Sequence, residues 1–222
     1  VDAKRRLAHH LRDDPARRRR AIGLYRDVFD ADPEASDVAD ALERLLRLEG
    51  DEYGEARTLA ARAEHARNRT DRLRTLTRLA TLHVMRRDLR EAAHACRRVL
   101  DELPAHRECA IRLRRAASRL GDRELLREAL ATEAQLALPA GDRARTLTAL
   151  AVELARAGSV EEAISCAEAA LSADPSSAEA ALLVSRHLEA VEQPRAALGM
   201  VRALKEFRQA HRDTLRLATG VR

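Results

Sequence analysis

The sequence predicts an all-α protein built as a solenoid of helical hairpins, and two observations support this fold class. Between Leu147 and Leu154, and again between Ala163 and Ala170, apolar residues recur three or four positions apart, which is the spacing of one helical face. Gly158 separates the two stretches, and the chain has no sustained alternation of β-branched residues that would indicate a strand. One such hairpin cannot bury both apolar faces, so neighbouring hairpins must stack on it.

The second observation is that this hairpin recurs along the chain. A small or apolar residue opens the second helix of each predicted hairpin, at intervals of 34 to 37 residues: Ala21, Ala56, Ala92, Leu126, Ala163 and Ala197. Prolines end four of the hairpins, at Pro33, Pro104, Pro139 and Pro175. The turn inside a hairpin is predicted at Gly50, Arg87, Gly121, Gly158 and Glu192.

The period divides the whole chain. We predict a single repeat array over residues 1–222 with about six hairpins, at 2–35, 36–70, 71–106, 107–142, 143–177 and 178–222. The chain opens with Val1 rather than Met, and its last residues lack an obvious polar capping helix. We therefore expect the array to be part of a longer protein.

The best-matched hairpin resembles the tetratricopeptide repeat family. Its residues at the family's signature positions are Ala144, Leu147, Leu150, Ala151, Leu154, Ala163, Ala167, Ala170 and Pro175. It departs from the family where Leu147, Leu154 and Ala167 replace aromatic residues and where Ala151 stands in place of the frequent glycine. The resemblance implies a right-handed superhelix in which the first helix of each hairpin lines the concave face, and it implies a scaffold rather than a chemistry.

Composition constrains the class and setting of the protein. Aromatic residues make up 2% of the 222 residues and Trp is absent, so leucine, alanine and valine must form the core. Only Lys4 and Lys205 among the 41 basic residues are lysine, which favours a GC-rich bacterial genome. Three cysteines form no disulfide framework, so we expect a reducing, cytoplasmic compartment. No apolar run is long enough for a membrane span.

Residues that resemble metal ligands or catalytic groups do not form a convincing site. His94, Cys96, His106 and Cys109 cluster in the sequence, but His94 and Cys96 are two positions apart on a predicted helix. That spacing turns them about 200° from one another, so they face different ways, with Cys96 in the core. No motif for nucleotide binding or for a nucleophile appears. We therefore expect no enzyme activity, no cofactor and no metal.

Charge gives the strongest hypothesis about function. Residues 71–140 carry 15 basic and 10 acidic groups, which accounts for the whole formal net charge of +5. Arg112, Arg115 and Arg119 lie three and four positions apart on one helical face. By the family resemblance this helix lines the concave groove, with Arg78 and Arg145 on the neighbouring hairpins. We predict that these five arginines bind a protein or peptide partner with an acidic segment. The competing interpretation is a solvated face with local ion pairs.

Two other interpretations stay open. Residues 17–20 form the longest basic run, and clustered cations of this kind can bind nucleic acid. However, Asp13, Asp14, Asp27 and Asp30 flank this run, and few aromatic residues are available to stack on bases. A nucleic-acid-associated regulatory module is therefore the second hypothesis for the function. Within the interaction hypothesis, self-stacking or packing against a missing domain is the alternative to peptide capture.

Overall fold

The computed structural model describes residues 1–136, 139–190, 199, 202, 205, 206 and 209. The described residues form eleven α-helices and no strand, which confirms the predicted all-α class. Residue contacts divide the chain into two compact units, Val1–Leu120 and Gly121–Arg222, called unit 1 and unit 2 below. The boundary falls inside the fourth predicted hairpin, between Leu120 and Gly121.

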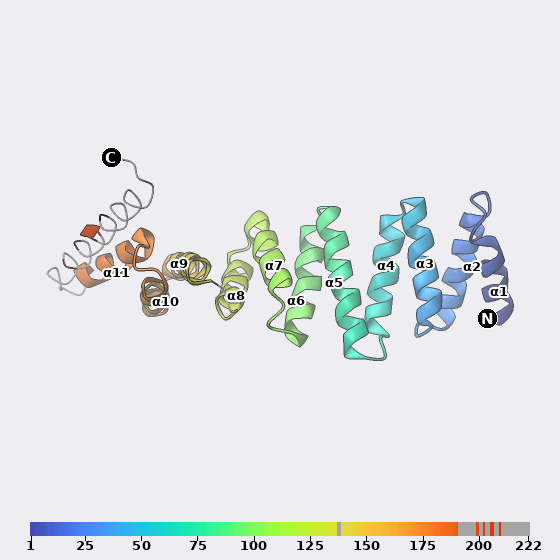
Figure 1. Ribbon diagram of the computed structural model, residues 1–222, viewed down its shortest axis with the longest axis horizontal. Coiled ribbons are helices and arrows are strands. Elements are labelled where there is room, and N and C mark those ends of the chain that lie inside the picture. The colour runs from blue at the N-terminus through green and yellow to red at the C-terminus, as the bar shows by residue number, and fades with distance from the viewer. Residues whose placement is uncertain (137–138, 191–198, 200–201, 203–204, 207–208, 210–222) are drawn as a thin grey trace, which may run out of the picture. The chain divides into compact units, whose positions relative to one another are not determined.

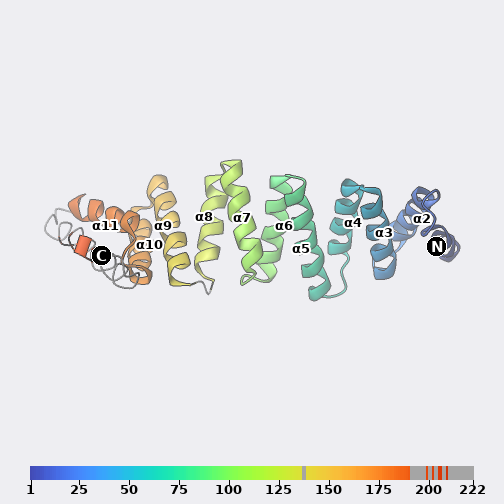
Figure 2. The ribbon, with the colours of Figure 1, turned by 45° about the horizontal axis from the view of Figure 1, so that its top comes forward.

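Unit 1 is a row of helices in which each contacts the next one along the chain (Figures 1 and 2). Its helices are α1 (Asp2–Leu11), α2 (Arg18–Ala31), α3 (Ser36–Glu49), α4 (Glu52–Glu64), α5 (Arg69–Met85), α6 (Leu89–Glu102) and α7 (Arg107–Leu120). The pairs α1–α2, α3–α4 and α5–α6 form three helical hairpins. Such neighbour contacts are what bury the apolar face of each hairpin in a solenoid.

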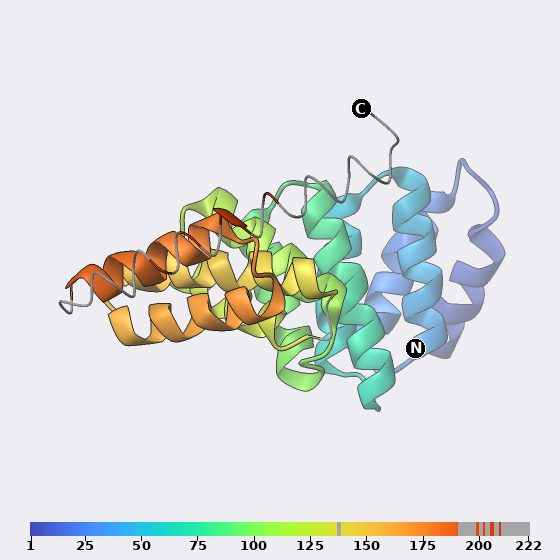
Figure 3. The same cartoon turned by 60° about the vertical axis from the view of Figure 1, so that its left-hand side comes forward.

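Unit 2 contains a hairpin with a third helix packed on it. Its described helices are α8 (Arg123–Ala134), α9 (Ala140–Ala157), α10 (Val160–Ala173) and α11 (Ala178–Ala190). The hairpin α9–α10 has α11 in contact with both of its helices, and Figure 3 shows these three helices along their length. Glu192, the predicted turn of the sixth hairpin, and Ala197, which is predicted to open its second helix, lie outside the described residues.

Four of the five predicted turns lie in the described residues, and they adopt the left-handed backbone conformation that ends a helix. Their φ angles are 70° at Gly50, 63° at Arg87, 69° at Gly121 and 88° at Gly158. At Gly158 the amide donates to the carbonyl of Ala155, and the next amide, of Ser159, donates to that of Leu154 at 3.0 Å. These bonds satisfy carbonyls that the helix leaves without partners. Glycine adopts this conformation without a Cβ penalty, and Arg87 does not.

Burial confirms the predicted register. Ala21, Ala56, Ala92 and Ala163, which open the second helices, are all buried, and Leu126 is half-buried. In the best-matched hairpin, Ala151, Ala167 and Ala170 are completely buried. Small side chains at these contacts allow two helices to approach closely. Among the described helices, none combines the length and the hydropathy that a membrane crossing requires.

Candidate partner-binding site

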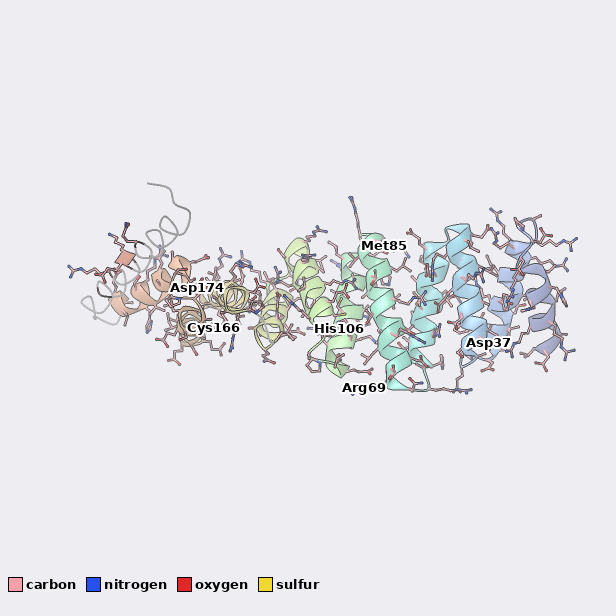
Figure 4. All side chains as sticks on the ribbon, viewed as in Figure 1. Asp37, Arg69, Met85, His106, Cys166 and Asp174 are labelled. Atoms are coloured by element: carbon pink, nitrogen blue, oxygen red, sulfur yellow. The ribbon has the colours of Figure 1, made fainter. Side chains whose placement is uncertain are left out.

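A hollow of about 590 Å³ opens over α3 and α5 in unit 1, beside the start of α4. The residues that line it are Asp40, Glu43, Arg44, Arg47, Gly50, Glu52, Glu55, Arg78, Thr81, Leu82 and Met85. Met85 lies at the end of α5 opposite Arg69 and is 66% exposed (Figure 4). Both α3 and α5 are first helices of predicted hairpins, which are the helices that the family resemblance places along the concave face.

Two of the carboxylates that line this hollow are almost completely buried. Glu43 is 1% exposed and Glu55 is 7% exposed, although charged side chains are rarely buried unless they are paired. Arg62 of α4 is also buried, and its Nη1 lies 2.9 Å from Oε1 of Glu43 and 2.6 Å from Oδ1 of Asp40. Burial lowers the pKa of Arg62, but the hydrogen bonds and charges of Glu43 and Asp40 together raise it. Arg62 is therefore charged, and it pairs with two carboxylates that line the hollow.

The ion pairs continue from Glu43 across the hollow. Nη1 of Arg78 lies 2.7 Å from Oε2 of Glu43, close enough for an ion pair although the contact lacks hydrogen-bond geometry. Nη2 of Arg78 lies 3.5 Å from Oε1 of Glu55, and Arg47 donates to the same oxygen at 3.0 Å. Positive and negative groups thus alternate from Asp40 to Arg47. We call this set the ion-pair chain: Asp40, Arg62, Glu43, Arg78, Glu55 and Arg47.

The ion-pair chain changes the interpretation of Arg78. The sequence pattern predicted an arginine available to a ligand, whereas the structure places its guanidinium against two buried carboxylates. Sequence reasoning missed Glu43 and Glu55 as groove residues. A signal was present for Glu43, because it lies on the buried side of α3 with Leu42 and Leu46. A charged residue among apolar residues of one helical face indicates a buried partner.

Arg112, Arg115 and Arg119 do lie on α7, but their surroundings differ. Arg112 is largely covered and donates to Thr81 of the hollow at 2.7 Å and to Glu108 at 2.6 Å. This bond to Thr81 places α7 next to α5 on the same surface of unit 1. Arg115 and Arg119 are exposed, and neither forms an ion pair with a residue that the structure describes.

The fifth predicted arginine belongs to the other unit. Arg145 of α9 is 80% exposed and forms an ion pair with Asp142 one helical turn away. The structure therefore brings Arg78 and the three arginines of α7 together within unit 1, and Arg145 lies in unit 2. Nothing in either unit requires Arg145 to share a ligand with α7.

Two of the four clustered cysteine and histidine residues are neighbours in the core. Cys96 and Cys109 are completely buried. The interaction between their thiols raises the pKa of Cys96 and lowers the pKa of Cys109. His94 is exposed, and Nδ1 of His106 accepts a hydrogen bond from the amide of Cys109 at 3.2 Å. The described residues contain no group of three side chains placed to hold a metal ion.

The basic run at residues 17–20 is partly neutralised. Nη1 of Arg18 lies 3.0 Å from Oε1 of Glu49, and Arg19 reaches the same carboxylate at 3.5 Å. Arg17 pairs with Asp14 at 3.3 Å. Three of the four arginines thus have acidic neighbours, which leaves less free charge for phosphate groups than the sequence run indicates.

Comparisons with known proteins give structural likenesses only. No model of a protein family and no curated protein matches the sequence. A crystal structure of MamA aligns with a TM-score of 0.48 at 16% identity, over 78% of this chain and 97% of that chain. MamA from Desulfovibrio magneticus RS-1 gives 0.43 at 17%, over 78% and 95%. YrrB, described as a TPR protein with an unusual peptide-binding site, gives 0.47 at 15%, over 88% and 97%.

Proposed function

We propose that this chain is a protein-interaction module whose helix α7 holds an acidic segment of a protein partner. Arg115 and Arg119 are the central contacts, with Arg112 beside them. The observation that supports this proposal is their exposure one helical turn apart, without an acidic neighbour among the described residues. A guanidinium has several donors in a fixed fork that fits a carboxylate, so two such groups can hold two acidic side chains.

The neighbouring hollow explains why the proposal centres on α7. In the hollow, the arginines Arg47 and Arg78 already have carboxylate partners, so an acidic ligand would compete with Glu43 and Glu55. On α7 no such competition is described for Arg115 and Arg119. The exposed Met85 lies in the same hollow as Thr81, to which Arg112 of α7 donates, and it offers apolar contact there. Arg78 and Arg145 stay predictions as flanking contacts.

The expected contribution of each arginine to binding follows from the exposure of Arg115 and Arg119 to solvent. An ion pair between exposed groups contributes about 0.2–1 kcal/mol because both partners keep much of their hydration. Binding should therefore depend on several arginines together and should weaken as salt increases. This behaviour separates the proposed contact from the buried pairs of the ion-pair chain, which salt screens much less.

The test is a titration of a fluorescent peptide rich in Asp and Glu against the full chain at low salt. The double variant Arg115→Glu/Arg119→Glu should weaken binding by about tenfold, since each reversal replaces an attraction with a repulsion. The matched control is Arg57→Glu/Arg90→Glu, which makes the same change in net charge at two exposed arginines of α4 and α6. This control should change the affinity by less than about threefold.

Two results would contradict the proposal. The first is equal peptide affinity for the α7 variant and the control variant, provided circular dichroism shows both to be folded. The second is single-stranded nucleic acid binding more tightly than the peptide with the same dependence on Arg115 and Arg119. That second result would instead favour the nucleic-acid hypothesis.

A further inference from the structure

The charges of the chain are distributed unequally among its helices, and two helices are the extremes. Helix α7 has five arginines and one glutamate, which gives it a net charge of +4, the most positive of the eleven described helices. Helix α10 has three glutamates and no basic residue, which gives it −3, the most negative. The most basic and the most acidic surfaces therefore occur on separate helices of the same chain.

The acidic side chains of α10 are available for contact. Glu161, Glu162 and Glu168 are exposed, and none forms an ion pair with a described residue. The opposite side of α10 buries Ala163 and Ala167, so the glutamates lie away from its apolar contacts. These carboxylates lack the arginine partners that most buried and half-buried acids of unit 1 have.

The other exposed residues on this face of α10 have small side chains. Ser165, Ala169 and Ser172 are exposed along the same helix. Small side chains let a second helix approach a helix surface closely, which shortens the distance between charges on the two helices. The exposed surface of α10 is therefore an acidic helix face with room for long side chains such as Arg115 and Arg119.

We infer that α10 of a second copy of this chain is the acidic segment that α7 binds, an inference that rests on the proposed role of α7. The argument for this occupant is charge complementarity between the exposed Arg115 and Arg119 on α7, a helix with a net charge of +4, and the exposed glutamates on α10, a helix with a net charge of −3. Complementary charge across an interface favours association and fixes which surfaces meet. The two surfaces differ, so each copy offers one of each kind and association can continue from copy to copy.

The test is sedimentation velocity of the full chain over a concentration series, at about 50 mM and about 500 mM salt. The wild type should associate at the lower salt and dissociate at the higher salt. Reversing either face alone, by Arg115→Glu/Arg119→Glu or by Glu161→Arg/Glu168→Arg, should weaken association by about tenfold or more. The control Arg57→Glu/Arg90→Glu should associate like the wild type within about threefold.

The decisive variant combines both reversals in one chain. It exchanges the charges of the two faces, so α7 becomes acidic and α10 basic, and association should return to within about threefold of the wild type. No recovery in this variant would overturn the inference, as would association that either single reversal leaves unchanged. Circular dichroism of each variant verifies that the helices are retained.

The outcomes separate this inference from the proposed function. A wild type that stays monomeric at every concentration would overturn the second copy as partner, whereas peptide binding to α7 would still support the proposed function. A wild type that neither self-associates nor binds the peptide would overturn both the inference and the proposed function. Self-association that depends on α10 but not on Arg115 and Arg119 would overturn the assignment of α7 as the receiving face.

Discussion

Helices α4 and α10 hold equivalent places in their hairpins but bury different chemistry. The buried residues of α10 are Ala163, Ala167 and Ala170. Those of α4 include Glu55, Thr58 and Arg62 beside its apolar residues. Both are second helices packed against the first helix of the same hairpin. The same helical period thus accepts either a close apolar contact or a set of charged groups.

The difference between α4 and α10 shows what each kind of buried residue requires from the neighbouring helix. An alanine contact needs only a small partner surface, which the preceding helix α9 supplies. A buried arginine needs carboxylates at hydrogen-bond distance, and Arg62 finds them in Asp40 and Glu43 of α3. Breaking a buried pair by removing one partner leaves an uncompensated charge. The stability of the hairpin α9–α10 should therefore depend on the size of the side chains at its contact. The stability of the hairpin α3–α4 should depend on keeping its buried charges paired.

The largest effect is expected at the alanine contact. Ala163→Arg places a long charged side chain where the native residue is 1% exposed, so we expect a loss of about 3 kcal/mol or more in the free energy of unfolding. The control Glu162→Arg changes the exposed neighbouring residue and should cost less than about 0.5 kcal/mol. Urea denaturation followed by circular dichroism measures both. Equal shifts of the two midpoints would show that the assigned register is wrong.

A smaller loss of stability is expected when one residue of the buried ion pairs between α3 and α4 is removed. Arg62→Ala should lower the free energy of unfolding by about 2–3 kcal/mol, because Glu43 keeps Arg78 as a second partner. The control Arg57→Ala removes an exposed arginine from the same helix and should change the free energy of unfolding by less than about 0.5 kcal/mol. Hydrogen exchange should show the loss of protection first in α3 and α4. Similar stability of the two variants would mean that the ion-pair chain contributes little.

The smallest effect concerns the turns of the two units. Arg87 and Gly158 hold the same place in their hairpins, with φ angles of 63° and 88°. We expect Arg87→Gly to stabilise by roughly 0.5–1 kcal/mol and Gly158→Arg to destabilise by about 1 kcal/mol, because only glycine adopts this conformation without steric cost. Thermal unfolding of the reciprocal pair measures the two changes. Shifts of the same sign would contradict this account.

The sequence alone determined the described helices, their turns and the small and apolar residues that face inward. Each of these depends on local rules: the spacing of apolar residues, the position of glycine, and the small residue at each helix contact. For this reason Ala163 and Gly158 were placed correctly from their neighbours in the chain. The exposed row of Arg115 and Arg119 also followed from spacing, because residues four positions apart share a helical face.

Only the tertiary structure decided which arginines already have acidic partners. Glu43 and Arg78 lie 2.7 Å apart although they belong to different hairpins, and Cys96 meets Cys109 across the α6–α7 contact. Helical period tells which side of its own helix a residue occupies but not which side chain from another helix meets it. Those contacts depend on how the helices pack, which pairs Arg78 with Glu43 but gives Arg115 and Arg119 no acidic partner among the residues that the structure describes.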